Sequence, residues 1–241
     1  MKRVVFASTI LSLGLMLSGC GEEKIASSQS DKETSDKAEK EQTTALAEIQ
    51  KHISTAWKPY DTTYVHSAAI YENKGNVPVE MKETQMNYKG TDGSILGTET
   101  MIYSVPAVIL PGETAIIVET GYLDGVNPEA FAETTYNFSF KETKEDPTLM
   151  EISGVKGIAG EYGYKVTGVL KNITEDQQDD IRIAAALLDA EGNLLGALKG
   201  SVDIGLAPNG ETGFELSYPD LPPNIQDKIA TIEVKSYGWN W

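Results

Sequence analysis

Cys20 is the only cysteine among 241 residues, and it follows a segment with the features of a secretory signal. Lys2-Arg3 carries positive charge, Val4–Leu17 is largely apolar, and the small residues Ser18-Gly19 stand directly before the thiol. About 14 apolar residues are too few for a transmembrane helix, which needs about 20. The pattern therefore predicts a signal peptide over residues 1–19, with Cys20 serving in attachment and not in redox chemistry.

The tetrapeptide Leu17-Ser18-Gly19-Cys20 resembles the lipobox of bacterial lipoproteins. The resemblance implies that residues 1–19 are removed and that Cys20 carries a diacylglyceryl thioether with fatty acyl chains such as palmitate. It also implies that acylated Cys20 binds the lipid bilayer, which places the protein on the extracytoplasmic face of the cell membrane. Each buried methylene of an acyl chain contributes about 0.8 kcal/mol, so two or three chains form a firm anchor.

Few other residues are spaced for catalysis or for metal binding. His52 and His66 are the only histidines, and neither has a second His or Cys at ligand spacing. Ser153 and Lys156 match the Ser-x-x-Lys pattern of penicillin-recognising enzymes, but the glycines among and after them would destabilise the helix which that chemistry needs. We therefore expect a protein that is not an enzyme, with no catalytic residues and no cofactor.

Acidic residues crowd one segment after Asn172, and oxygen ligands at that density could hold Ca²⁺. They are Glu175, Asp176, Asp179 and Asp180. A solvated hairpin tip explains the same pattern. Asp189–Asn193 also has some likeness to a calcium loop, but its glycine is fourth and not sixth, which is typical of a hairpin turn. We expect no metal at either place.

The C-terminus has an unusual aromatic pattern. Ile232 and Val234 indicate that one face of a strand packs on a core. Strict alternation then places three aromatic residues on the opposite face: Tyr237, Trp239 and Trp241. A bulge at Gly238 would return the rings to the core. Without a bulge the rings are exposed, and they form a possible binding surface for sugars or for a protein partner.

Charge and composition describe the rest of the chain. The formal charge of −16 becomes −18 when the two positive residues of the signal peptide are removed, and no run of Lys or Arg occurs, which excludes nucleic acid as a partner. Residues 20–43 are mostly Glu, Lys, Ser, Asp, Gln and Thr, a composition that predicts a disordered tether. A coil of about 23 residues reaches roughly 25–30 Å.

The folded part begins with apolar residues at helical spacing: Ala45, Leu46, Ile49, Ile53 and Trp57. This spacing predicts a short amphipathic helix that caps the first domain. From about Tyr64 onward the residues alternate as in strands and are interrupted by Gly, Pro, Asn and Asp, which predicts an all-β fold.

An internal repeat runs through the β-rich part. Asn73 stands 24 residues before Gly97, and Asn172 stands 24 residues before Gly196. The turns that follow repeat with a period of 98–99 residues: Leu110–Thr114 and Ala207–Thr212. A unit of about 100 residues can bury one core, so the repeat predicts two tandem immunoglobulin-like β-sandwich domains.

We place the first of these domains at residues 44–147 and the second at residues 148–241. In the second domain, alternate residues are expected to line its core: Ile181, Ile183, Ala185 and Leu187. In the first domain the matching positions are Thr84, Met86 and Tyr88. Each strand is thus predicted to bury one face.

The second unit resembles the FxLYD family of bacterial β-sandwich domains. The matches are Val166–Asn172, Leu187, Asp189, Gly192–Gly196 and Gly210-Glu211-Thr212. Ala185 and Leu188 stand where the family has Phe and Tyr. The resemblance implies an interaction or structural module and supplies no catalytic residues.

These observations favour a membrane-anchored lipoprotein of the cell envelope that acts as a non-enzymatic interaction or structural module, with an envelope protein or a glycan as partner. One alternative is a hydrolase or transferase of cell-wall polymers with a carboxylate site. Buried, convergent acids in a cleft would favour it. The other alternative is a ligand-capturing lipoprotein, but such proteins usually need two α/β lobes.

Overall fold

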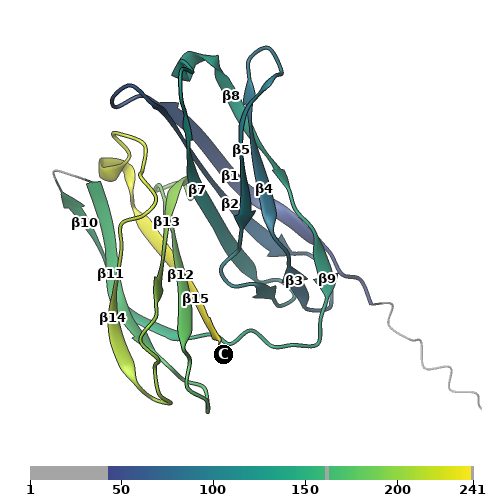
Figure 1. Cartoon of the computed structure of the whole chain (residues 1–241). Coiled ribbons are helices and arrows are strands. Elements are labelled where there is room, and N and C mark those ends of the chain that lie inside the picture. Colours follow the sequence, from purple (N-terminus) through teal and green to yellow (C-terminus); the bar gives the residue numbers. More distant parts are fainter. Residues whose placement is uncertain (1–42, 161–162, 240–241) are drawn as a thin grey trace, which may run out of the picture. The chain divides into compact units, whose positions relative to one another are not determined.

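The computed structural model describes residues 43–160 and 163–239 (Figure 1). The strands before residue 143 form what we call the N-terminal half: β1 (Ala47–Trp57), β2 (Thr63–Asn73), β3 (Val79–Met81), β4 (Thr84–Gly90), β5 (Ile95–Ile102), β6 (Val108–Ile109), β7 (Thr114–Leu123), β8 (Phe131–Asn137) and β9 (Phe140–Glu142). The later strands form the C-terminal half: β10 (Glu151–Gly160), β11 (Gly163–Lys171), β12 (Asp180–Leu188), β13 (Leu194–Val202), β14 (Glu211–Leu216) and β15 (Thr231–Trp239).

Single 3-10 turns, η1 (Pro128–Ala130) and η2 (Gln226–Lys228), interrupt the strands. Within the two described ranges, no helix has the length and apolar character that crossing a bilayer requires. The predicted all-β fold is therefore confirmed. Cys20, the signal peptide and residues 20–42 of the predicted tether lie outside the described residues.

In the N-terminal half, antiparallel sheets of order β1-β2-β7 and β5-β4-β8 pack face to face, and a small sheet β6-β3-β9 adjoins them. Their shared core contains Val65 and Tyr71 of β2, Ile117 of β7, and Met86 and Tyr88 of β4. In the C-terminal half, sheets of order β10-β11-β14 and β13-β12-β15 enclose a second core. Packing of two sheets around one apolar layer is that of a β-sandwich.

The sequence repeat corresponds to a repeated set of hydrogen bonds. Asn73, at the end of β2, donates from Nδ2 to the carbonyls of Val77 and Ile109, both at 2.8 Å. Asn172, just after β11, donates in the same way to the carbonyls of Asp176 and Leu206, again at 2.8 Å. In both copies the asparagine Oδ1 also accepts from the backbone N–H two residues on. The buried amide thus holds together the loops at one end of each half.

Asn172→Ala is expected to lower the free energy of unfolding by about 3 kcal/mol, because it removes the two hydrogen bonds that the buried amide donates and the one that it accepts from the Thr174 N–H, each of which contributes about 1 kcal/mol. Asn73→Ala should cost a similar amount. Urea denaturation measures both, with the exposed Asn137→Ala as the matched control. A loss below about 1 kcal/mol would show that water replaces the asparagine at these loops.

The predicted hairpin turns are present. Asp92 Oδ1 accepts from Ser94 N, and Asp189 Oδ1 accepts from Asn193 N. The glycine in each turn has a positive φ, +82° at Gly93 and +79° at Gly192. Hydrogen bonds from the side chain and then from the backbone N–H of Ser94 lower the pKa of Asp92, and those of Asn193 lower the pKa of Asp189, because they stabilise the charged carboxylates.

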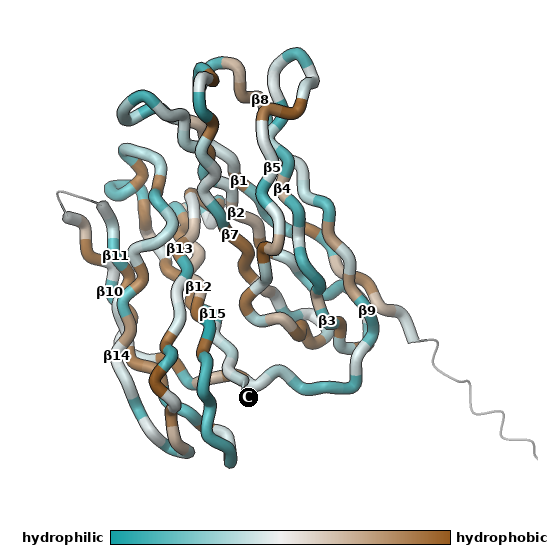
Figure 2. Tube along the Cα trace, in the orientation of Figure 1, coloured by the Kyte–Doolittle hydropathy of each residue, from teal (hydrophilic) through white to brown (hydrophobic). Residues whose placement is uncertain are grey.

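The two halves share a third apolar layer. It lies between sheet β1-β2-β7 and sheet β13-β12-β15, and its buried residues include Ala68, Ile70, Ile116, Val118, Ala184, Ala186, Leu188, Ala197 and Tyr237. Hydrophobic residues along β7 and β12 are visible in Figure 2. The prediction that each strand buries one face is therefore wrong for these sheets. Both faces of β12 are covered, one by its own half and one by the N-terminal half.

The predicted helix at residues 45–57 is also wrong, because Ala47–Trp57 is strand β1. It pairs with β2 along its whole length, and the register shifts between Ile49 and Lys51. Because of this bulge, side chains before and after it that would share a face of a regular strand lie on opposite faces of β1. Ile49 packs on the core of the N-terminal half, whereas Ile53 packs in the layer between the halves. Residues four apart share a face in a helix and in a regular strand, so the spacing alone did not distinguish the two.

Candidate functional site

The residues with most potential for binding line a cavity of about 520 Å³ where the two halves meet. We call it the aromatic groove. Its lining includes Tyr103, Arg182, Lys199, Tyr218, Tyr237 and Trp239. The volume falls within the range of small-molecule sites, roughly 300–1,000 Å³.

Strand β15 brings two of the sequence-predicted aromatic residues to this groove. Its register with β12 is regular through Gly238, so the expected bulge is absent. Tyr237 therefore lies on the face opposite Ile232 and Val234, but the N-terminal half covers that face and buries the ring. Trp239 is 38% exposed. Trp241 lies outside the described residues.

Tyr237 and Trp239 support each other. Their rings meet edge to face with centroids 5.7 Å apart. The guanidinium of Arg182, on the neighbouring strand β12, lies 5.9 Å from the Trp239 ring centre. Burial raises the pKa of Tyr237, which keeps its hydroxyl neutral at physiological pH.

Sequence reasoning missed two exposed rings of the groove, Tyr103 and Tyr218. Their exposed fractions are 53% and 49%. Tyr103 donates its hydroxyl to Glu83 Oε1 at 3.1 Å, and Tyr218 donates to Glu119 Oε1 at 2.6 Å. Both rings stand in connections outside the named strands and far apart in the chain, so no periodic pattern marks them.

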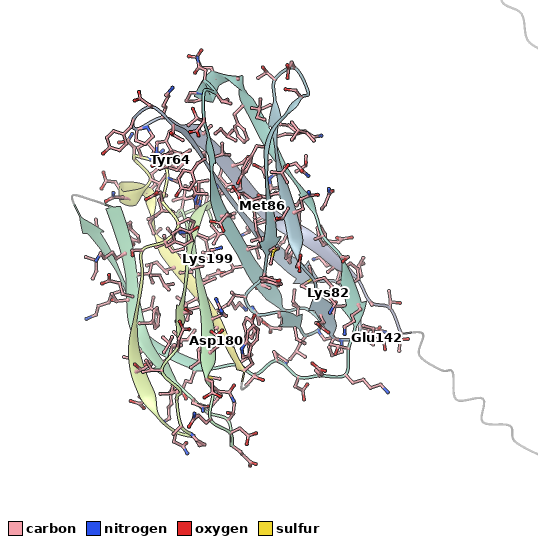
Figure 3. All side chains as sticks on the ribbon, in the orientation of Figure 1. Tyr64, Lys82, Met86, Glu142, Asp180 and Lys199 are labelled. Atoms are coloured by element: carbon pink, nitrogen blue, oxygen red, sulfur yellow. The ribbon has the colours of Figure 1, made fainter. Side chains whose placement is uncertain are left out.

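The groove carries two positive side chains, and each is paired with a carboxylate. Arg182 donates from Nε and Nη2 to Asp180 Oδ2, at 3.1 and 2.6 Å. Lys199 donates to Glu119 Oε2 at 2.7 Å, and its Nζ lies 5.6 Å from the Tyr218 ring centre. Asp180 and Lys199 are labelled in Figure 3 on neighbouring strands, β12 and β13. Because both cations are compensated, the groove has little net charge of its own.

Glu119 joins the two halves. Its two carboxylate oxygens accept from Lys199 and Tyr218, both in the C-terminal half. Burial together with this nearby negative charge raises the pKa of Tyr218. Half-buried Glu99 also has a raised pKa, first through burial and then through Glu119. Since Glu119 is already held by two donors, its position is that of a structural ion pair between the halves.

His66 is a second polar contact between the halves, and it is fully buried. Ala197 N–H donates to its Nε2 at 3.2 Å, which assigns a lone pair to that nitrogen. The proton of the neutral ring is then on Nδ1, which donates to Thr120 Oγ1 at 3.0 Å. Thr120 in turn donates to the carbonyl of Asp220 at 2.9 Å. Burial lowers the pKa of His66 from 6.5 to about 4, so the ring is neutral at pH 7.

Gly196, one of the repeated glycines, makes room for this imidazole. A Cβ at residue 196 would lie 3.0 Å from His66 Nε2 and 3.2 Å from Leu221 Cδ2. The close approach of β13 to His66 therefore favours a residue without a side chain.

Of the remaining sequence candidates, Asp180 contacts the groove through Arg182, and the others lie elsewhere. His52 is exposed on β1, and Ser153 and Lys156 lie in strand β10, not in a helix. In the acidic segment, Asp176 accepts from Asn172 through its carbonyl, and Asp180 binds Arg182. Among residues 43–160 and 163–239, no group of three His, Cys, Asp or Glu side chains is placed to hold a metal ion.

Comparison with protein families and with curated proteins found no match to this chain. The candidate site therefore rests on its own geometry. The exposed rings can stack on a flat apolar surface of a ligand. The neighbouring Arg182 and Lys199 can donate hydrogen bonds to its polar edge.

Proposed function

We propose that this protein is a lipid-anchored lipoprotein of the bacterial cell envelope, and that its folded part is a non-enzymatic binding module. The anchor rests on Leu17-Ser18-Gly19-Cys20, which resembles a lipobox, and on the signal-like segment before it. The binding role rests on the aromatic groove. Acyl chains on Cys20 would hold the protein on the extracytoplasmic face of the cell membrane.

We also propose that the two halves are tandem immunoglobulin-like β-sandwich domains, at residues 44–147 and 148–241, and that the second is related to the FxLYD domains. The matching hydrogen bonds of Asn73 and Asn172 support a shared plan. The sheets support it as well, because β1-β2-β7 corresponds in order to β10-β11-β14, and β5-β4-β8 to β13-β12-β15.

The packing between the halves supports a binding role over a purely passive one. Lys51, Glu113 and Glu119 of the N-terminal half contact Gly192, Lys235 and Lys199 of the C-terminal half, respectively. These contacts, together with the apolar layer, hold Tyr103 of the N-terminal half and Trp239 of the C-terminal half in the lining of one groove. A tether of about 23 residues would reach roughly 25–30 Å between Cys20 and the start of the folded part.

Cys20→Ala is expected to move the protein from the membrane fraction to the soluble or secreted fraction, because it removes the only thiol that can be acylated. The measurement is cell fractionation with intact-mass spectrometry of the mature chain. The native protein should begin at residue 20 and carry the added mass of its acyl chains. Ser28→Ala, in the predicted tether, leaves both the thiol and the lipobox-like motif in place and is the control.

An unmodified native protein that is secreted without acyl chains would contradict the anchor. It would not bear on the binding role of the folded part, which depends on the aromatic groove and not on Cys20.

A further inference from the structure

The aromatic groove has three exposed rings, and each contacts another side chain. The hydroxyl of Tyr103 is held by Glu83, that of Tyr218 by Glu119, and the Trp239 ring packs edge to face with Tyr237. Rings fixed in this way bind a ligand with little loss of side-chain entropy. Their exposed surfaces suit a partner that has apolar faces of comparable size.

The charges of the groove restrict the ligand further. Arg182 and Lys199 already lie over Trp239 and Tyr218, so a ligand cation would meet like charge at the rings. An anion gains little either, because each cation is neutralised by its own carboxylate and the whole chain carries −16. A neutral ligand avoids both penalties.

The hydrogen-bonding groups favour a ligand rich in hydroxyl or amide groups. Arg182 has five N–H donors, of which Asp180 takes two, and its side chain is 47% exposed. Lys199 also lines the groove, and Glu119 takes one of its three N–H donors. A volume of about 520 Å³ is typical of a small-molecule site and fits a short segment of a polymer.

We propose that the aromatic groove binds a neutral carbohydrate chain, with sugar faces stacked on Tyr103, Tyr218 and Trp239 and sugar hydroxyls bound by Arg182 and Lys199. This inference rests on the proposed binding function and names its ligand class. A cell envelope is rich in such polymers, so a protein anchored there would meet them directly.

The test is isothermal titration calorimetry on the full chain as isolated, in a detergent without sugar head groups. The probes are neutral tetrasaccharides of β-1,4-linked N-acetylglucosamine, glucose and galactose, a glucuronic acid oligosaccharide of equal length, and choline. We expect at least one neutral tetrasaccharide to bind more tightly than either charged probe. Trp239→Ala and Tyr103→Ala should each weaken that binding by about tenfold or more.

Two variants serve as controls. Tyr60→Ala removes a ring that is 83% exposed but lies outside the groove, and it should leave the affinity unchanged. Tyr103→Phe keeps the ring but loses the bond to Glu83 that fixes it, so its affinity should fall between those of the native protein and Tyr103→Ala. Thermal unfolding of each variant verifies that the fold persists.

The proposal is overturned if no neutral tetrasaccharide binds at up to about 10 mM, well above the 1 mM that corresponds to a weak complex. It is also overturned if a charged probe binds more tightly, or if the Trp239→Ala and Tyr103→Ala variants bind as the native protein does. Release of new reducing ends during the titration would contradict the non-enzymatic role. Cys20 acylation is read separately by mass, so failure of the anchor and failure of the ligand assignment remain distinct.

Discussion

Lowering the pH from 7 to 4.5 is expected to destabilise the native protein by about 2 kcal/mol more than a His66→Gln variant. In the folded protein the His66 ring is neutral, because burial lowers its pKa from 6.5 to about 4. The unfolded chain takes up a proton below pH 6.5, whereas the folded protein takes it up only near pH 4. Stability therefore falls as the pH drops through this window, and the loss is complete below about pH 4.

The geometry explains why the folded protein resists this proton. Protonation at Nε2 would place an N–H against the Ala197 N–H that now donates to it. Glu119 and the Asp220 carbonyl favour the charged ring, but burial outweighs both. Because His66 belongs to the N-terminal half and Ala197 to the C-terminal half, acid is expected to weaken the contact between the halves first.

Urea denaturation at several pH values measures the effect, and the exposed His52→Gln serves as the matched control. The control should keep the pH dependence of the native protein. If His66→Gln does not fold, NMR of the native protein provides the second measurement, since its only other imidazole is that of His52. Titration of His66 near pH 6.5 in the folded state would refute the explanation.

Ala186→Arg is expected to lower the free energy of unfolding by about 4 kcal/mol or more, because it overpacks a tight layer and places a charge in it. Ala186 is fully buried between the halves and pairs with Ala197 across strand β13. Its small side chain allows sheet β13-β12-β15 to lie close to Ala68 and Ile70 of β2. An arginine there has no space in the layer, and the carboxylate of its cross-strand neighbour Glu233 is exposed at the edge of that layer.

Thermal unfolding measures the loss, with Ala190→Arg in an exposed turn as the control. Proteolysis within residues 143–149, which connect β9 to the C-terminal half, gives a second measurement, since opening of the layer should expose that segment. The aromatic groove spans the same contact, so saccharide binding should be lost with it. An Ala186→Arg protein as stable as the control would mean that the halves do not need this layer.

Some of the fold could be predicted from residue types, because local chemistry determines it. The turns at Asp92-Gly93 and Asp189–Asn193 follow from carboxylates that accept nearby N–H groups and from glycines at positive φ. The equal spacing of Asn73 and Asn172 indicated the repeat. Each asparagine makes the same hydrogen bonds to the loops at one end of its half, which explains why it recurs at the same place in the repeat.

Other features were misread although a signal was present. Ala184-Ala185-Ala186 and Ile116-Ile117-Val118 are continuous apolar runs, which are typical of strands buried on both faces. We predicted one buried face because the repeat suggested separate domains. Residues 47–57 were predicted to be helical because their apolar residues recur at intervals of four. Residues four apart share a face in a strand as well, and pairing with β2 makes this segment a strand.

The aromatic groove could not be predicted from alternation along the chain, because its residues come from distant segments. The C-terminal rings were predicted to be either folded back by a bulge or exposed, and the register with β12 gave neither result in full. Tyr237 is buried by the other half, and Trp239 stays partly exposed. Tyr103 and Tyr218 join them only because packing of the two halves brings distant connections together.

The amino-acid sequence by itself determined the strand-rich character, the turns and the internal repeat, since these depend on neighbouring residues and on alternation along the chain. Only the tertiary structure decided that the inner sheets are covered on both faces, that His66 is neutral and buried, and that four aromatic rings surround one groove. Those outcomes depend on contacts between residues that are far apart in the chain, and burial and hydrogen bonding at such contacts have no local signature.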